Sequence, residues 1–225
     1  MKTTARPGIE AVLFDLDGTL VDSAPDLAGA VNELRVVRGL VELPFERLRP
    51  LVGSGARGMV GAAFGIGPGD AGFALLRDEF LLYYERRLLK LTVVFENIPL
   101  VLSALEAARL PWGIVTNKAT RFSKPLTAGI AALHGSAALV SGDTTPHAKP
   151  HPAPLLEAAR QLGVQAQKCV YVGDDLRDVQ AARAAGMAAV VAAWGYLGED
   201  AAIATWHADA VVERPLDLLI WLGMA

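Results

Sequence analysis

The stretch VLFDLDGTLVDS, residues 12–23, carries three carboxylates within eight positions, directly after an apolar run. Asp15 and Asp17 are two residues apart, so in an extended chain their side chains lean to the same side. Two carboxylates held together in this way repel each other unless a cation lies between them. Oxygen ligands of this kind select a hard ion, and Mg²⁺ is the usual one where phosphate is handled. Asp15 and Asp17 therefore indicate a metal-dependent site.

Further polar side chains follow other apolar runs of the chain. These residues are Thr116, Asn117 and Lys118, then Lys149, then Asp174 and Asp175, with Asp178 one helical turn later. In an open parallel sheet the ligand site lies outside the carboxyl ends of the strands, so these residues are expected to converge on one crevice. With Mg²⁺ and Lys149 in place the crevice attracts a phosphate, and the Thr116 hydroxyl and the backbone amides of Thr116 and Asn117 complete its hydrogen bonding.

The elements that must position these residues are short strands that alternate with helices. The apolar runs expected to form buried parallel strands are 11–14, 112–116, 137–140, 169–173 and 188–193. Apolar residues at three- and four-residue spacing predict helices over 99–110, 152–163 and 178–187. The alternation predicts an α/β fold, a doubly wound parallel sheet in a Rossmann-like core.

Residues 21–94 break this alternation, because they show helical periodicity and no convincing strand. A crossover between parallel strands needs only about a dozen residues. We therefore expect an inserted α-helical cap domain over 21–94, carried by an α/β catalytic core formed by 1–20 and 95–225. Ser23 and Asp26 at the start of its first helix are expected to form a capping box, which makes Asp26 structural.

Composition bounds the function further. The chain has 225 residues, a charged fraction of 20% and a formal net charge of −3, as in a globular protein and unlike a nucleic-acid-binding one. No apolar run reaches the roughly 18 residues of a membrane span, and the first residues lack the apolar segment of a signal peptide. The single cysteine, Cys169, fits a reducing compartment. We expect a cytoplasmic protein that binds neither nucleic acid nor membrane, and the sequence indicates no oligomeric state.

The chain resembles the haloacid dehalogenase superfamily of phosphatases, in the branch with a helical cap after the first strand. DLDGT at 15–19 is similar to the first motif of that family and VTN at 115–117 to the second. Lys149 in KPHP is similar to the third motif and VGDDLRD at 172–178 to the fourth. The resemblance covers essentially the whole chain. Two departures, Asp175 where Ser or Thr is more usual and FENIP for a Pro-Gly turn, leave details of the hinge and of the metal surroundings open.

The resemblance implies a covalent mechanism. Asp15 would be the nucleophile that attacks phosphorus to form an aspartyl-phosphate. Asp17 would be the general acid for the leaving alkoxide and then the base for water. Thr116, Asn117 and Lys149 would bind the phosphoryl oxygens and stabilise their charge in the transition state.

The resemblance also implies a ligand set for the metal. Mg²⁺ would be held by the Asp15 carboxylate, the Asp17 backbone carbonyl and the Asp174 carboxylate. Asp178 and Asp175 would not bind the metal directly, but would contact it through waters or support the site through Lys149.

Within the family the residues indicate a phosphomonoesterase for a small phosphorylated metabolite, because Asp17 argues against a dehalogenase or a phosphonatase. DLDGTLVDSAPDL resembles the opening of phosphoglycolate phosphatases, the first candidate. GIVTNKATRF, VGDDLRDVQAARAAG and WGYLGED resemble phosphatases acting on N-acetylmuramate 6-phosphate in cell-wall recycling, the alternative. A sugar phosphomutase is a third possibility. A receiver domain, phosphorylated without turnover, combines similar residues but has no cap.

The cap should decide the substrate. VGSGARGMV at 52–60 is its best candidate for a substrate loop, because glycines let the backbone approach closely and Arg57 could bind a carboxylate bidentately. Both candidate substrates carry a carboxylate, so Arg57 does not separate them. Arg121 is a weaker candidate for the same role, and Trp194 and Tyr196 are read as packing residues.

Overall fold

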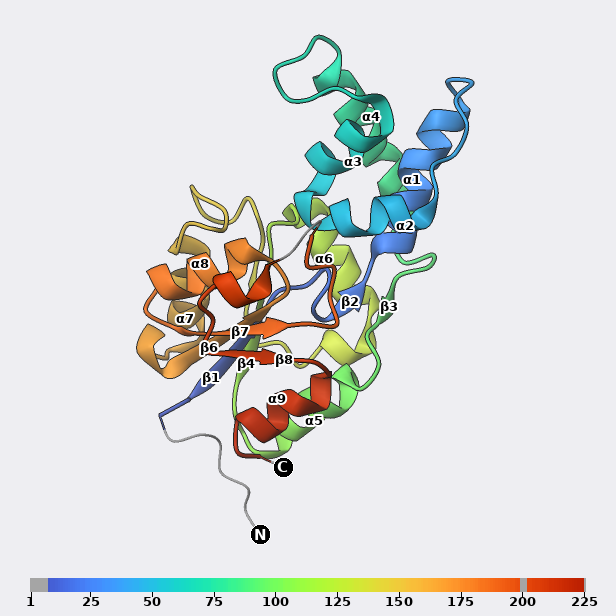
Figure 1. The fold of residues 1–225 in the computed structure, drawn as a ribbon. Coiled ribbons are helices and arrows are strands. Elements are labelled where there is room, and N and C mark those ends of the chain that lie inside the picture. Colours follow the sequence, from blue (N-terminus) through green and yellow to red (C-terminus); the bar gives the residue numbers. More distant parts are fainter. Residues whose placement is uncertain (1–7, 199–201, 225) are drawn as a thin grey trace.

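The structure, a computed structural model, describes residues 8–198 and 202–224. Its core is a six-stranded sheet in the order β5-β4-β1-β6-β7-β8. The strands are β1 Ala11–Phe14, β4 Trp112–Val115, β5 Leu139–Val140, β6 Cys169–Gly173, β7 Ala188–Ala192 and β8 Ala210–Val212. Every neighbouring pair is parallel, which confirms the predicted α/β fold class (Figure 1).

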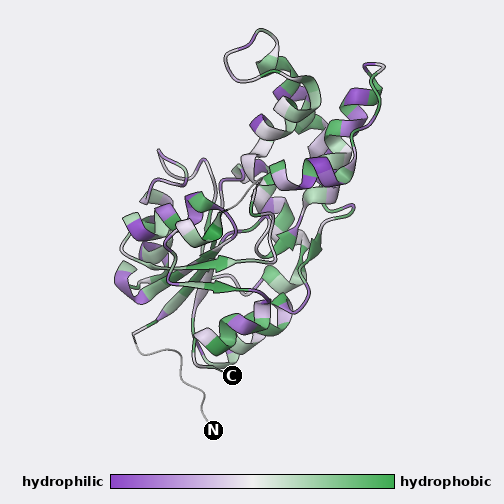
Figure 2. Cartoon of the chain, viewed as in Figure 1, coloured by the Kyte–Doolittle hydropathy of each residue, from purple (hydrophilic) through white to green (hydrophobic). Residues whose placement is uncertain are grey.

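Helices cover both faces of this sheet. They are α5 Ile98–Ala107, α6 Thr120–Gly129, α7 Ala153–Leu162, α8 Leu176–Ala184 and α9 Pro215–Trp221, with short 3-10 turns at Ala131–Leu133, Ala166–Lys168 and Ile203–Thr205. Val12 and Phe14 pack in one apolar cluster with α5 and α9, while Ala11 and Leu13 pack in another with α7 and α8. Alternate strand residues thus meet opposite helix layers, and this is why the strands are continuously apolar in sequence and in Figure 2.

The predicted strands and helices of the core are present with small differences at their ends. The expected strand 137–140 is reduced to its last two residues, and Gly163 ends α7 in the left-handed conformation, as expected of a C-cap. Strand β8 was not predicted. It is three residues long at the edge of the sheet and only Val212 in it is buried, so its apolar signal is weak.

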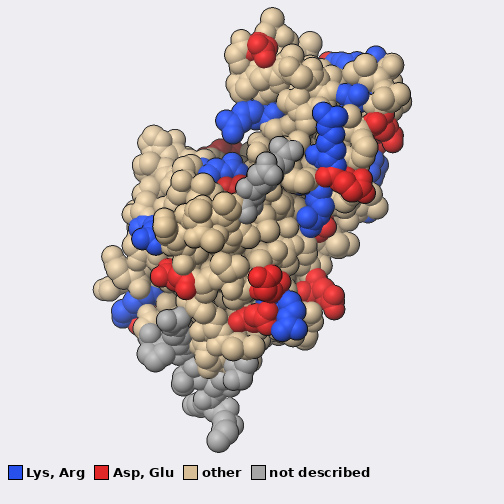
Figure 3. Space-filling view, viewed as in Figure 1, with Lys and Arg blue, Asp and Glu red and all other residues tan. Residues whose placement is uncertain are grey.

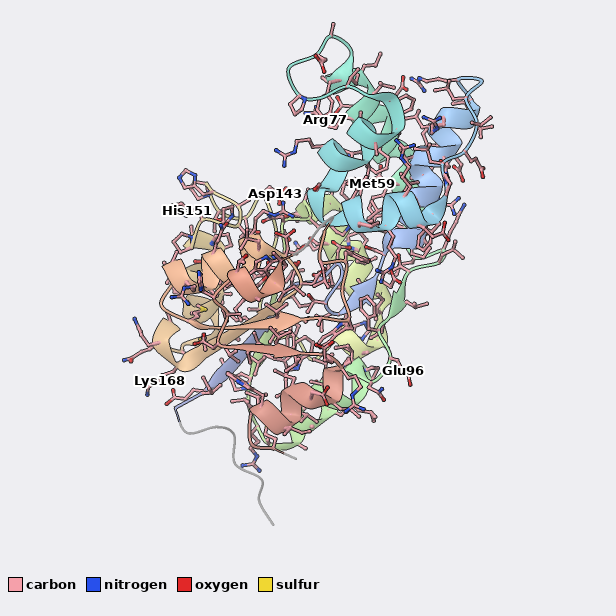
Figure 4. All side chains as sticks on the ribbon, in the orientation of Figure 1. Met59, Arg77, Glu96, Asp143, His151 and Lys168 are labelled. Atoms are coloured by element: carbon pink, nitrogen blue, oxygen red, sulfur yellow. The ribbon has the colours of Figure 1, made fainter. Side chains whose placement is uncertain are left out.

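Four helices form the inserted part of the chain. They are α1 Ala24–Val36, α2 Phe45–Leu48, α3 Gly55–Phe64 and α4 Phe73–Arg87, with a 3-10 turn, η1, at Arg49–Ser54. They enclose an apolar cluster that includes Met59, labelled in Figure 4, and that extends to Phe122 and Tyr196 of the core. An antiparallel ribbon, β2 Val21–Asp22 with β3 Val93–Val94, joins them to the core. The expectation of no strand in this segment is therefore wrong, since two residues per strand leave no periodic signal.

The predicted capping box at the start of α1 is also wrong. Ser23 is the N-cap residue, but its hydroxyl donates to the Asp17 carboxylate and accepts no hydrogen bond from a helix amide. The Asp26 carboxylate accepts hydrogen bonds from the backbone amides of Leu91 and Thr92 at 2.9 and 2.8 Å. Asp26 is structural, as expected, but it ties α1 to the segment that returns to the core.

The surface gives two further facts. The face shown in Figure 3 intersperses basic and acidic side chains over both the helical part and the core. None of the helices in the described ranges has the length and the apolar character to cross a bilayer.

Candidate active site

The strand register brings the predicted site residues to one edge of the sheet. Phe14 of β1 lies opposite Ile114 of β4 and Val172 of β6, so the residues that follow these strands emerge side by side. There they line a cavity of about 350 Å³ between the core and the helical part. The predicted residues in its lining are Asp15, Asp17, Thr116, Asn117, Lys149, Asp174, Asp175 and Asp178.

An acidic cluster lies on the core side of the cavity. Asp15, Asp174 and Asp178 each offer a carboxylate oxygen, and these atoms all lie within 4.8 Å of one another. Burial raises the pKa of Asp15 to about 7, against the lowering effect of Lys149, and the neighbouring Asp178 adds to the rise. Burial, with the charges of Asp15 and Asp178, raises the pKa of Asp174 well above its ordinary value. A divalent cation would relieve this repulsion, and three carboxylates are donors suited to a hard metal ion.

We expect the metal-free protein to lose stability as the pH rises from about 4 to about 7. The folded state keeps a proton on Asp15 up to a pKa of about 7, whereas the unfolded carboxyl has its ordinary value of 3.8. In that interval the folded state therefore binds more protons than the unfolded state, and raising the pH favours unfolding. Thermal unfolding with and without Mg²⁺ should show a larger Mg²⁺-induced rise in Tm at about pH 7.5 than at about pH 5. Equal rises at both pH values would contradict this linkage.

Lys149 balances part of the negative charge. Its Nζ atom lies 2.8 Å from Asp15 Oδ1 and 2.8 Å from Asp178 Oδ1, and it donates to the Tyr171 hydroxyl at 2.7 Å. Burial alone would lower the pKa of Lys149, but the two carboxylates raise it. The sequence analysis did not identify Tyr171 as a site residue, because it lies inside an apolar strand. Its hydroxyl in turn donates to the Val115 carbonyl at 2.7 Å, which fixes the lysine between β4 and β6.

Thr116 and Asn117 differ in what they can offer to a phosphate. The Thr116 amide donates to the Val140 carbonyl at 2.9 Å, so the amide is committed to the sheet and only the expectation that this amide binds phosphate is wrong. The Asn117 side chain holds the backbone of Lys149, with its Oδ1 atom 2.9 Å from the Lys149 amide and its Nδ2 atom 3.0 Å from the Lys149 carbonyl. Asn117 thereby positions the lysine as well as lining the cavity.

Asp17 does not share the acidic cluster. Its Oδ1 atom accepts a hydrogen bond from the Ser23 hydroxyl and lies 3.1 Å from Lys118 Nζ. Lys118 Nζ also donates at 2.8 Å to the hydroxyl of Tyr84, which belongs to α4. Burial would lower the pKa of Lys118, but Asp17 and Tyr84 raise it. The sequence placed Lys118 at a strand end without giving it a role, and the structure makes it the link between Asp17 and the helical part.

The Asp174 carboxylate is oriented by two hydrogen bonds. Thr19 Oγ1 donates to its Oδ1 atom at 3.0 Å, and the Tyr196 amide donates to its Oδ2 atom at 2.8 Å. Gly18 makes this contact possible, because its φ is +87° and a Cβ atom there would collide with the Asp174 carboxylate. Gly18 and Thr19 after β1 are thus required by their contact with Asp174, the residue that follows β6.

Tyr196 has a polar role in addition to packing. Its hydroxyl accepts hydrogen bonds from the amides of Ser23 and Ala24 at 2.9 and 3.1 Å and donates to Asp22 Oδ1 at 3.0 Å. Together with its amide bond to Asp174, this connects the acidic cluster to the first turn of α1. Tyr196 packs in a buried apolar cluster, as expected, and these hydrogen bonds are an additional role.

Asp175 and Arg177 form a second contact between the core and the helical part. Asp175 Oδ1 accepts hydrogen bonds from the Arg177 amide and Nε at 2.8 and 2.7 Å, and Oδ2 from Nη2 at 2.7 Å. Burial opposes ionisation of Asp175, but the bonds from Arg177 outweigh it and lower its pKa. Arg177 Nη2 also donates to the carbonyl of Gly53 in η1. Asp175, the departure from the family pattern, thus positions an arginine that contacts the predicted substrate loop.

Arg57 does not line the cavity. It is exposed on α3, although its neighbours from Val52 to Ala56 do reach the cavity wall, and the arginines in the lining are Arg121 and Arg177. The difference arises because α3 begins at Gly55, so successive side chains turn away from the loop face. Most of the remaining wall on this side is apolar, formed by Leu27, Val52, Ala56, Phe80, Leu81 and Tyr84, and Phe122 of α6 lines the cavity from the core.

Known proteins are similar to this chain over most of its length. The family model described as haloacid dehalogenase-like hydrolase matches residues 12–192. A phosphoglycolate phosphatase of Xanthomonas campestris is 47% identical over 209 residues, which cover 92% of this chain and 94% of the relative. The N-acetylmuramic acid 6-phosphate phosphatase of Pseudomonas aeruginosa is 39% identical over 220 residues, 98% of this chain and 97% of the relative.

A solved structure also matches. The crystal structure of a predicted phosphoglycolate phosphatase from Haemophilus somnus superimposes with a TM-score of 0.84 and 28% sequence identity, and the match covers 95% of this chain and 98% of that one.

Proposed function

The chain belongs to the haloacid dehalogenase-like hydrolases, and we propose that it is a Mg²⁺-dependent phosphatase that hydrolyses a small phosphomonoester through an aspartyl-phosphate on Asp15. The observation that carries this proposal is the acidic cluster of Asp15, Asp174 and Asp178 beside a buried lysine, at the floor of a cavity. Buried carboxylates in such proximity serve a bound cation, and a cation beside a lysine favours a phosphate.

The metal would be held by the acidic cluster. Asp15, Asp174 and Asp178 fit a divalent ion by donor type and spacing, and the Asp17 backbone carbonyl is a further predicted ligand. When bound, the ion neutralises these carboxylates and withdraws charge from the phosphoryl group. Thr19 and the Tyr196 amide keep Asp174 in place for this role.

The remaining catalytic roles are assigned to side chains of the protein. Asp15 would attack phosphorus, with Lys149 orienting its carboxylate and binding a phosphoryl oxygen. Asp17, held by Ser23 and Lys118 apart from the acidic cluster, would protonate the leaving oxygen and then deprotonate the water that hydrolyses the aspartyl-phosphate. The Thr116 hydroxyl would bind a second phosphoryl oxygen.

We also propose that residues 21–94 act as a cap that closes the cavity, on a catalytic core of 1–20 and 95–225. The ribbon of β2 and β3 supports this division, because the chain enters and leaves the helical part through two neighbouring strands. Tyr84 and Gly53 bring the cap into contact with Lys118 and Arg177 of the core. A closed cap excludes water from the reacting groups.

Two substrates are candidates. Phosphoglycolate is the first, because the relative with 47% identity carries that name. The cavity favours the second, N-acetylmuramate 6-phosphate. The cavity volume of about 350 Å³ and the largely apolar cap wall suit a leaving group with N-acetyl and lactyl methyl groups. Glycolate, by contrast, has almost no apolar surface to bury.

The test measures phosphate release from both compounds side by side, with Mg²⁺ and then with a chelator. We expect turnover with Mg²⁺, loss of at least about 99% of it with chelator, and recovery when Mg²⁺ is restored. A preference for either substrate names the leaving group. Undiminished activity in chelator would refute the metal-dependent mechanism, and a stable phosphoprotein without turnover would favour a receiver-like role.

A further inference from the structure

The positive charges that line the cavity are almost all neutralised by the protein. Three cationic side chains there have carboxylate partners: Lys149 with Asp15 and Asp178, Lys118 with Asp17, and Arg177 with Asp175. Arg121 also lines the cavity. Within residues 8–198 and 202–224, no carboxylate lies within ion-pair distance of its guanidinium.

Asp143 is an acid that contacts the start of α6, at Thr120, and its carboxylate already accepts hydrogen bonds there. Asp143, labelled in Figure 4 near the junction of core and cap, accepts hydrogen bonds from the Thr120 amide, at 2.9 Å, and from the Thr120 hydroxyl. These bonds lower the pKa of Asp143. Its charge therefore stabilises the first turn of α6 and does not neutralise Arg121 in the same turn.

The Arg121 guanidinium stacks on one aromatic ring, that of Phe122, instead of pairing with an acid. Its guanidinium carbon lies 4.3 Å from the centroid of the Phe122 ring, and that ring packs against Tyr84 of the cap at a centroid distance of 5.3 Å. A guanidinium stacked on a ring keeps its N–H groups free at the edge, where they can bind a planar anion.

We infer that Arg121 binds a carboxylate on the leaving group of the substrate. This inference rests on the proposed function and assigns to one residue the recognition of the carboxylate that both candidate substrates carry. The phosphoryl group has the bound metal and Lys149 as partners, which leaves Arg121 for a second anion. One guanidinium matches a single carboxylate in charge and in its two-pronged geometry, whereas a second phosphate would call for further cations.

The alternatives in the sequence are less suited to this role. Arg57 and Arg121 are both exposed, but only Arg121 lines the cavity. Arg177 does line it, but two of its nitrogens are bound to Asp175, and one of these also binds Gly53 of the cap. Arg121 is thus a specificity-determining residue outside the family motifs that identified the rest of the site.

The experiment compares substrates that differ in the carboxylate. N-Acetylmuramate 6-phosphate is matched with N-acetylglucosamine 6-phosphate, which lacks the lactyl group, and 2-phosphoglycolate with ethyl phosphate. The wild-type enzyme is expected to prefer the carboxylate member of at least one pair. In Arg121→Gln the ratio of kcat/KM between the members of that pair should fall about tenfold or more, mainly through KM. Arg121→Lys should retain part of the preference that Arg121→Gln loses, because lysine keeps the positive charge but lacks the two-pronged geometry of the guanidinium.

Two further variants serve as controls. Arg86→Gln removes an exposed cap arginine that also stacks on an aromatic ring, Tyr83, and should leave the ratio unchanged. Arg57→Gln tests the alternative suggested by the sequence. Loss of preference in Arg57→Gln but not in Arg121→Gln would overturn the inference, as would an equal loss on both members of a pair in Arg121→Gln.

Failure of the inference and failure of the proposed function are distinguishable. A wild-type enzyme that hydrolyses p-nitrophenyl phosphate with Mg²⁺ but shows no preference for carboxylate substrates would overturn the inference and leave the proposed function intact. A protein without Mg²⁺-dependent hydrolysis of any of these esters contradicts the proposed function itself, and the inference falls with it.

Discussion

Replacement of Asp15 by Asn should lower turnover by at least about four orders of magnitude while the protein remains folded. The amide has nearly the shape of the carboxylate but cannot attack phosphorus to form the aspartyl-phosphate. Burial, with the charge of Asp178 added, raises the pKa of Asp15 to about 7, so the uncharged amide removes both the cost of burying a charge and a repulsion. In chelator the Tm of the variant should therefore equal or exceed that of the wild type. Single-turnover phosphate release and thermal unfolding measure the two effects.

Glu10→Gln is the matched control for this change. Glu10 precedes the same strand at its other end, where it is exposed and pairs with Lys168, labelled in Figure 4 far from the cap. The control should keep the kcat and the Mg²⁺ dependence of the wild type. If Asp15→Asn retained a substantial fraction of turnover, Asp15 would not be the nucleophile.

Replacement of Lys149 by Met should cost both activity and stability. Lys149 is 5% exposed and lies 2.8 Å from both Asp15 and Asp178, so its loss leaves two buried carboxylates without their counter-ion. Removing one partner of such a buried pair costs about 3–5 kcal/mol of unfolding free energy, and the loss of a phosphoryl ligand should lower kcat by about a thousandfold. Urea unfolding in chelator and steady-state kinetics in Mg²⁺ measure these effects.

The matched control here is Lys168→Met. Lys168 forms an ion pair with Glu10 at 2.7 Å, but both side chains are exposed, so its loss should cost no more than about 1 kcal/mol. Because a bound cation also compensates the carboxylates, Mg²⁺ should reduce the destabilisation of Lys149→Met and leave that of Lys168→Met unchanged. Equal destabilisation by the two changes would show that Lys149 is not the counter-ion of the cluster.

The sequence alone predicted the fold class and the place of the site. Apolar runs buried on both faces read as parallel strands, and in such a sheet a polar residue is tolerated where the strand ends. Asp15, Thr116 and Asp174 therefore had to emerge at one edge, and they do. The elements that the sequence analysis missed, β2, β3 and β8, are two or three residues long and lack a run of buried residues. Elements of this length leave no periodic signal.

Only the tertiary structure decided which side chains meet. Lys118 contacts Asp17 and Tyr84, Arg177 reaches Gly53, and Tyr171 fixes Lys149, in each case across long separations in the chain. Likewise the sequence favoured Arg57 over Arg121 as a substrate-binding residue, and the packing places Arg121 but not Arg57 in the lining of the cavity. The physical reason is that local sequence determines where the backbone leaves a strand or a helix. The partner of a buried charge depends instead on distances between elements, which exist only once the cap and the core have packed.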